Sequence, residues 1–328
     1  MIQFLRRNQQ SFIVFTFLYG IVAVIISYIK HPNFSTLSSP FRNPLISGVI
    51  SNNLLNQNTY LLFTILAILA LVFLGFYFTR ITLKFLILSS RSQFPALFFL
   101  SISAFAISGE LFPEAIVSCL FLLLCIERLF DSVGQKGLSY RFFDSGILLG
   151  LSCLFYMNMI FLIPFFLLTQ IILRQVNWRE LLFVLLGVSL PFLYGLILLY
   201  LKGYSIAGAR DHILQWVLLK RISSGNIYFL SGTGFYLFML LISSLYALRK
   251  FATTKILIRK YYQLLFLLFL NLLCILLFVP SASKELFFLL AIPGSVPLSI
   301  YFTNCRSNIV NNLFLLILLA FPIIIYFI

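Results

Sequence analysis

Apolar residues run along this chain in long blocks separated by short polar or charged stretches. The blocks lack the alternation of barrel strands, and many approach the roughly 20 residues that a helix needs to cross a bilayer. Because backbone groups in lipid must be hydrogen-bonded within the protein, such blocks predict helices. We predict an all-α fold with about eleven transmembrane helices, over residues 11–29, 59–79, 93–109, 111–126, 142–157, 158–173, 181–201, 228–248, 262–280, 286–302 and 311–328.

Composition supports a membrane protein. Of the 328 residues, 62% are hydrophobic and only 9% are charged, a balance that soluble domains do not have. No polar linker or tandem repeat divides the chain, so we predict a single integral membrane domain over 1–328, with its longest outer loops at 30–58 and 202–227. The five cysteines form no CxxC pair and there are only two histidines, so no metal site is predicted.

Basic residues set the predicted orientation. With the N-terminus in the cytoplasm, most of the 23 lysines and arginines fall in inner loops, as the positive-inside rule requires. We therefore predict a bacterial inner-membrane protein with a cytoplasmic N-terminus. The net charge of +15 is spread over short loops between apolar blocks, which favours membrane lipids as partners and argues against nucleic acid.

The apolar segment 142–173 decides the topology downstream. Arg141 precedes it and Arg174 follows it, and both flanks favour the cytoplasmic side. We predict two short crossings with a reversal near Tyr156-Met157-Asn158-Met159; the alternative is one long tilted helix. Two crossings place the stretch 202–227 on the outer side, and one crossing places it inside.

The outer stretch 202–227 carries basic residues where the charge rule disfavours them. Arg210 offers a planar fork for phosphate oxygens, Lys220 and Arg221 add point charges, and His212 lies two residues after Arg210. We predict that these four residues bind a substrate phosphate. The alternative is contact with lipid headgroups without specificity.

Two glutamates in the outer turn SGELFPEA are the predicted catalytic residues. Glu110 and Glu114 are four positions apart, on one face if the turn is helical, and a carboxylate there could act as a general base. A divalent cation between them has no further ligand to support it, so no cofactor is predicted. The alternative is that both acids end helices at the water boundary, and Glu114 after Pro113 suits a helix start.

The other acids receive ordinary structural interpretations. Asp144 lies three residues after Arg141, which predicts a local ion pair at the inner surface. Lys284 and Glu285 are adjacent between two apolar blocks, which is typical of a solvated turn.

The centre of the chain resembles the membrane-embedded glycosyltransferases of the GT-C superfamily, which use polyprenyl-phosphate sugars. The resemblance rests on SISAFAISGELFPEAIVSCLFLLLCIERLFD, a helix pair flanking a short outer turn, and on RFFDSGILLGLSCLFYMNMIFLIPFFLLTQIILRQVNWRELL, a glycine-containing pair of short helices. It implies a GT-C-like helical bundle. The whole chain also resembles an uncharacterised family of bacterial multi-pass inner-membrane proteins of similar length, which implies no activity.

The resemblance implies a transferase that acts on a polyprenyl-phosphate-linked sugar or lipid at the outer face. GT-C enzymes usually carry an acid in the first outer loop, and residues 30–58 contain none. Glu110 and Glu114 match the position of the family's second acidic site. Two alternatives stay open: a non-catalytic membrane subunit or scaffold of a larger envelope complex, with protein partners in the membrane, and a carrier for a lipid or an anion.

Overall fold

A computed structural model of the chain describes residue 6 and residues 9–29, 57–88, 92–107, 113–133, 139–173, 178–201, 227–251, 254–279, 284–305 and 309–327. Over these residues the fold is all-α, as predicted, with no strand. The helices are α2 (Gln9–Ile29), α4 (Gln57–Lys84), α5 (Phe94–Ala106), α6 (Pro113–Ser132), α7 (Ser139–Phe155), the 3-10 helix η3 (Met157–Leu162), α8 (Ile163–Leu173), α9 (Trp178–Leu201), α11 (Ile227–Phe251), α12 (Ile256–Phe278), α13 (Leu286–Asn304) and α14 (Ile309–Phe327).

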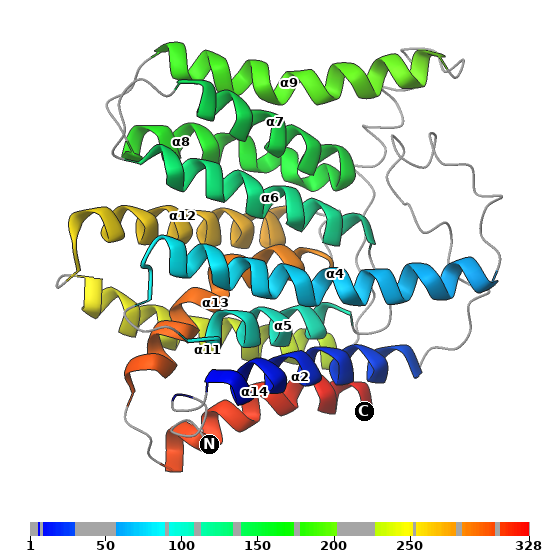
Figure 1. Cartoon of the computed structure of the whole chain (residues 1–328), viewed down its shortest axis with the longest axis vertical. Helices are drawn as coiled ribbons and strands as arrows, with labels where there is room; N and C mark the ends of the chain where they lie inside the picture. The colour runs from blue at the N-terminus through cyan, green and yellow to red at the C-terminus, as the bar shows by residue number, and fades with distance from the viewer. Residues whose placement is uncertain are drawn as a thin grey trace.

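The helices run back and forth across the molecule with their axes roughly aligned (Figure 1). The first end of this bundle gathers the C-terminal ends of α4, α6, α8, α11 and α13, together with the N-terminal ends of α7, α9, α12 and α14. The second end gathers the N-terminal ends of α4, α6, α11 and α13, together with the C-terminal ends of α2, α9, α12 and α14. Each α-helix therefore runs opposite to the one before it, as consecutive crossings of a membrane require.

Among the described helices, five are long and apolar enough to cross a membrane. They are the segments Ile65–Lys84, Glu180–Leu198, Ser231–Arg249, Ile256–Phe278 and Leu286–Asn304. The prediction of a multi-pass helical membrane protein is confirmed at this level. The count of about eleven crossings is not supported by helix length, because α5, with 13 residues, is only about 20 Å long against a hydrocarbon core of about 30 Å.

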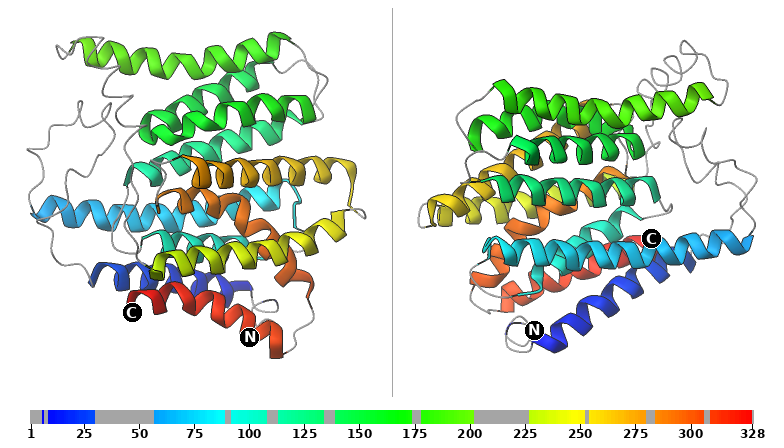
Figure 2. Two further views of the ribbon diagram at one scale, coloured as in Figure 1. Left: turned by 180° about the vertical axis from the view of Figure 1, so that it is seen from behind. Right: turned by 45° about the horizontal axis from the view of Figure 1, so that its top comes forward.

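The chain reverses direction within 142–173, where the sequence predicts a break. α7 ends at Phe155, Tyr156 has an extended backbone (φ −130°, ψ 99°), and η3 leads into α8. α8 then returns to the first end of the bundle and packs against α12 (Figures 1 and 2). The alternative of one continuous helix is therefore wrong, because the extended residue at Tyr156 interrupts the hydrogen-bond ladder.

The centre of the bundle is formed by α5 and α13. Every residue of α5 is buried, and 83% of the residues in the α13 span are buried. Their phenylalanines interlock, with ring centroids 5.2 Å apart for Phe98 and Phe302 and 5.1 Å apart for Phe105 and Phe287. The short length of α5 is tolerated because protein surrounds it, so its ends do not have to match the thickness of a lipid layer.

Glycines bring α7 and α9 unusually close. A Cβ atom at Gly187 would lie 2.5 Å from the carbonyl oxygen of Phe143, and one at Gly146 would lie 2.6 Å from that of Val184. Gly150 makes a similar approach to Val188 one turn further along. Small residues four apart allow this close contact between membrane helices, so these glycines fix α7 against α9.

Basic residues gather at the first end of the bundle, which we call the basic end. Arg6 lies there and donates hydrogen bonds to the carbonyl oxygens of Phe302 and Cys305, the latter at 2.7 Å, and so satisfies the last turn of α13. The other described basic residues in helix segments of this end are Arg80, Lys84, Arg128, Arg141, Arg179, Arg249, Lys250, Lys255, Arg259 and Lys260. We call the second end the opposite end.

Candidate functional site

Of the two predicted catalytic residues, Glu114 is the one that lies among the described residues. It lies in the first turn of α6, directly after Pro113, and only 6% of its surface is exposed. Proline at the first helical position costs no hydrogen bond, and the partial positive charge of the helix N-terminus favours a carboxylate there. These factors explain the helix start, but they do not require the side chain to be buried.

The turn of α6 that follows Glu114 is bound to two neighbouring helices. Ser118 lies four residues after Glu114, and its hydroxyl oxygen is 2.7 Å from that of Ser152 in α7. The thiol of Cys119 donates to the carbonyl oxygen of Phe288 in α13, at 3.5 Å. Because residues four apart share a helix face, Glu114 lies on the face of α6 that carries Ser118, toward α7.

The reversal after α7 adds two buried polar side chains at the opposite end. The amide of Tyr156 donates to the carbonyl oxygen of Ser152 at 2.9 Å, so Tyr156 follows the Ser118–Ser152 contact by one turn. The side-chain amide of Asn158 donates to the hydroxyl of Tyr156 at 3.0 Å. Both side chains are fully buried, and the hydrogen bond between them satisfies polar groups that water does not reach.

Glu285 is a second buried carboxylate at the opposite end, and it corrects the prediction of a solvated turn at 284–285. It immediately precedes α13, and only 3% of its surface is exposed. Its carbonyl oxygen accepts from the amide of Phe288 at 3.2 Å. The sequence gives two adjacent charges between apolar blocks, but only the packing of α13 against its neighbours decides that this start is covered.

Glu114 and Glu285, the buried acids described at the opposite end, lie at similar heights in the bundle. α6 and α13 both run from the opposite end to the basic end, and the Cys119–Phe288 contact joins them. Glu114 precedes Cys119 by five residues, about 7.5 Å along the axis, and Glu285 precedes Phe288 by three, about 4.5 Å.

The remaining predicted site residues lie outside the described residues. Glu110 belongs to the undescribed 108–112, and the predicted phosphate-binding residues belong to the undescribed 202–226. The helices that flank these segments are described. The N-terminal end of α6, the C-terminal end of α9 and the N-terminal end of α11 all lie at the opposite end of the bundle (Figure 1). The predicted phosphate-binding residues are Arg210, His212, Lys220 and Arg221.

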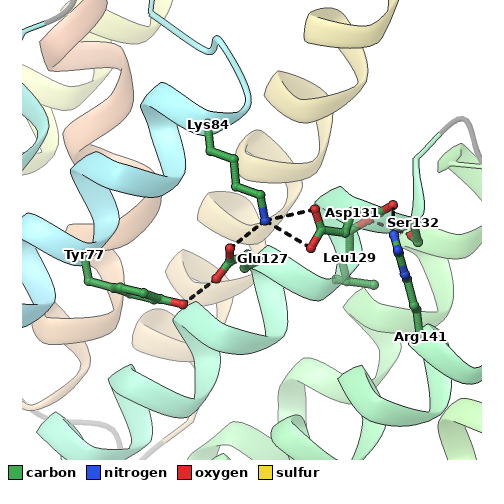
Figure 3. A network of polar contacts seen from close by, with 7 residues as sticks. All are labelled: Tyr77, Lys84, Glu127, Leu129, Asp131, Ser132 and Arg141. Atoms are coloured by element: carbon green, nitrogen blue, oxygen red, sulfur yellow. Dashed lines mark hydrogen bonds and ion pairs between the residues drawn. The ribbon is translucent and has the colours of Figure 1, made fainter.

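A charged network at the basic end was missed by the sequence analysis (Figure 3). The ammonium of Lys84 in α4 lies 2.7 Å from a carboxylate oxygen of Glu127 and 3.1 Å from one of Asp131, both in α6. Tyr77, two turns before Lys84, donates to Glu127. Glu127 and Asp131 are four residues apart on one helix face, and that spacing is the signal that could have found them.

Arg141 joins α7 to the same network. Its guanidinium donates to the main-chain oxygen of Asp131, in the last turn of α6 (Figure 3). Among the described residues it forms no ion pair with Asp144, so the predicted local pair is wrong. A guanidinium that binds a helix C-terminus satisfies an unpaired carbonyl and favours the helix dipole.

The network lowers the pKa of Glu127, the acid at its centre. Glu127 lies just beyond the predicted crossing 111–126 and is partly buried. Burial opposes ionisation, but the hydrogen bonds from Lys84 and Tyr77 outweigh it and hold the pKa of Glu127 below its ordinary value. The carboxylate therefore stays ionised and paired, which suits a contact that joins α4 to α6 better than a proton acceptor.

Within the described part of the chain, no group of three or more His, Cys, Asp or Glu residues could hold a metal ion. All five cysteines are free thiols, and four of them are buried. The described residues therefore direct attention to single carboxylates, Glu114 above all.

Comparison with known proteins identifies one family. The model of a family of unknown function (DUF6427) matches residues 43–328, most of the chain. The chain therefore belongs to the DUF6427 family. No curated protein and no solved structure matches the chain.

Proposed function

We propose that this member of the DUF6427 family is a multi-pass protein of the bacterial inner membrane with about eleven transmembrane helices. We further propose that it is a GT-C-like transferase, acting on a polyprenyl-phosphate-linked sugar or lipid at the outer face. One observation carries the proposal: Glu114 is buried at the end of the bundle where α9 ends and α11 begins. The basic segment 202–226 is attached between those two helix ends.

In this proposal Glu114, with Glu110, acts on the acceptor. The carboxylate takes the proton from an acceptor hydroxyl. At the same time the hydroxyl oxygen of the acceptor attacks the anomeric carbon of the donor sugar. The bond from that carbon to the phosphate oxygen breaks, and the polyprenyl phosphate leaves with the bonding electrons. A carboxylate that is largely removed from water suits this role, because water would compete with the acceptor.

The basic segment acts on the donor. Arg210 binds two phosphate oxygens through its planar fork, and Lys220, Arg221 and His212 add positive charge where the leaving phosphate gains negative charge. The polyprenyl chain stays in the lipid beside the bundle, so the reacting phosphate has to lie at the membrane boundary. Both groups of residues then meet the substrate from the same side of the membrane.

A binding measurement tests the role proposed for the basic segment. Purified protein in lipid nanodiscs should bind polyprenyl phosphate, and Arg210→Ala should weaken that binding about 10-fold or more, as expected for the loss of a charge-assisted bidentate contact. Arg128→Ala, at the basic end, is the matched control and should bind as the wild type does. Wild-type affinity in Arg210→Ala would eliminate the phosphate role.

A non-catalytic membrane subunit is the second candidate function, and α9 favours it. Only 22% of the residues in Glu180–Leu198 are buried, because α9 stands at the edge of the bundle and packs mainly against α7 (Figure 2). An apolar helix face of this kind can contact a partner protein in the membrane. If cells that carry the double variant Glu110→Gln and Glu114→Gln keep the phenotype of the wild type while a deletion does not, the subunit role replaces the transferase.

A further inference from the structure

Two arginines lie at one height on neighbouring helices at the basic end. α4 and α6 run in the same direction and pack against each other (Figure 1). Lys84 of α4 contacts Asp131 of α6, 47 positions further along the chain. The same offset places Arg80 level with Glu127, and Arg128 directly follows Glu127. Arg80 and Arg128 therefore differ in height by about the 1.5 Å rise of one helical residue.

Both arginines are exposed, and neither forms a hydrogen bond or an ion pair with any residue that the structure describes. The nearby carboxylates of Glu127 and Asp131 are instead bound by Lys84 (Figure 3). Three cations thus outnumber two carboxylates at this corner, so its surface is positive. A guanidinium presents a planar set of N–H donors that matches the oxygens of a phosphate. Two of them side by side suit an anion from outside the chain.

An exposed apolar stripe leads along α4 to Arg80. Leu66, Leu69 and Phe73 are 66%, 54% and 59% exposed, and Tyr77 continues the stripe by stacking on Phe73, with ring centroids 5.9 Å apart. Spacings of three and four residues place these side chains on one helix face. They belong to the span Ile65–Lys84, which could cross a membrane, so lipid would cover them. From Leu66 to Arg80 the stripe is about 21 Å long, more than the roughly 15 Å of one leaflet's hydrocarbon layer.

The arginines lie where the apolar part of each helix ends. α4 has no charged residue before Arg80, and α6 has none between Glu114 and Glu127. A charge at this boundary lies at the level of the lipid headgroups. Charge and shape together select the occupant: a free phosphate ion would leave the stripe unused, and a zwitterionic lipid would bring its own cation to the arginines. An anionic phospholipid matches both the arginines and the stripe.

We propose that α4 and α6 bind one anionic phospholipid at the basic end, with its phosphate between Arg80 and Arg128 and one acyl chain along Phe73 and Leu69. The site lies at the other end of the bundle from Glu114, so it does not depend on the proposed transferase. In nanodiscs that contain phosphatidylglycerol, this phospholipid is in excess and fills the site. Loss of Arg128 therefore leaves the binding of polyprenyl phosphate at the opposite end unchanged.

Native mass spectrometry of the full chain with bound lipid tests the role of the arginines. We expect the wild type to retain phosphatidylglycerol in preference to phosphatidylcholine. Arg80→Gln and Arg128→Gln should each lower that preference about five-fold, the effect of one basic residue near an anionic lipid. Arg249→Gln, which removes an exposed arginine of α11 at the same end, is the matched control and should leave it unchanged. An equal loss in Arg249→Gln, or wild-type preference in both other variants, would overturn the proposal.

Fluorescence quenching by lipids with brominated acyl chains tests where the chain lies. In Phe73→Trp, after subtraction of the signal from the parent protein, phosphatidylglycerol should quench more strongly than phosphatidylcholine, and added Arg80→Gln should remove the difference. Leu193→Trp, on the exposed side of α9, should be quenched equally by both lipids. Equal quenching at position 73 would overturn the proposal. Loss of the difference on addition of inorganic phosphate at constant ionic strength would also overturn it, because the arginines would then bind a free ion.

Discussion

The carboxylates at the two ends of α6 differ in their exposure to solvent. At the basic end, Glu127 and Asp131 of α6 are partly exposed and bind Lys84 of α4 (Figure 3). At the opposite end of the same bundle, Glu114 of α6 and Glu285 before α13 are buried. Glu127 and Asp131 join α4 to α6 where water screens the charges, and such pairs contribute little to stability. The basic end also holds a buried acid, Glu180 in the first turn of α9, which is 5% exposed.

The opposite end requires another explanation. Burying a carboxylate costs free energy unless its surroundings compensate, and the N-terminal end of α6 supplies part of that compensation to Glu114. We therefore expect a structural role for Glu127, which pairs with Lys84, and the proposed catalytic role for Glu114, although both lie on α6. The buried pair of Tyr156 and Asn158 beside the reversal closes the same end with neutral groups.

The largest expected effect is on sugar transfer, when one glutamate at each end of α6 is replaced by glutamine. Glu114→Gln should reduce sugar transfer from a polyprenyl-phosphate donor about 100- to 10,000-fold, the usual contribution of a general base. Glu127→Gln should leave transfer within about two-fold, because general-base catalysis needs a group that reaches the substrate. Transfer assays with both variants in proteoliposomes measure this ratio. Equal losses in the two variants would remove the distinction between the ends.

The buried amide at the opposite end should have the next largest effect. Asn158→Leu keeps the size of the side chain but removes the donor to the Tyr156 hydroxyl, which should lower the free energy of unfolding by about 1–3 kcal/mol. Unfolding in a titration of denaturing detergent measures the change. Ser189→Ala, which removes an exposed hydroxyl bonded within α9, is the control and should be nearly neutral.

A smaller effect is expected at the basic end. Glu127→Gln should lower the free energy of unfolding by about 0.5–1 kcal/mol, because the pair with Lys84 is partly exposed to solvent. A double-mutant cycle with Lys84→Met isolates the interaction between the two side chains. The coupling should weaken as salt is raised. A coupling of several kcal/mol that is insensitive to salt would show that the pair is effectively buried.

The pH dependence of stability should be the smallest effect. The folded pKa of Glu127 is lowered from its ordinary value of 4.5, so its stabilising contribution is complete above that pH and is lost as pH falls through the folded pKa. Wild-type protein should therefore lose stability relative to Glu127→Gln below about pH 4.5. Unfolding titrations of both proteins from pH 6 to pH 3 check the sign.

Much of the fold was predictable from the apolar blocks. The eleven predicted segments correspond in order to the eleven described α-helices, and the break at Tyr156–Met159 lies where α7 gives way to η3. Helix ends were less predictable. α4 continues to Lys84 and α6 to Ser132, beyond the predicted ends at 79 and 126, because helical hydrogen bonds continue into polar turns whose side chains reach water.

The candidate site was predictable only in part. Glu114 stood out as an acid beside a turn, and the structure buries it. Glu285 did not stand out, because adjacent opposite charges usually mark a solvated turn and nothing local shows that α13 starts inside the bundle. The Lys84–Glu127–Asp131 network joins residues more than 40 positions apart, so only its spacing within α6 was visible in the sequence.

The sequence by itself determined that this is a helical, multi-pass membrane protein, because a bilayer allows few ways to satisfy the backbone of so many apolar blocks. It also determined where the chain turns back after Phe155. The tertiary structure alone decided which helices form the centre, which carboxylates are buried and which lysine pairs with which acid. These properties depend on contacts between distant segments, and hydropathy is nearly the same for a helix that faces lipid and one that faces protein.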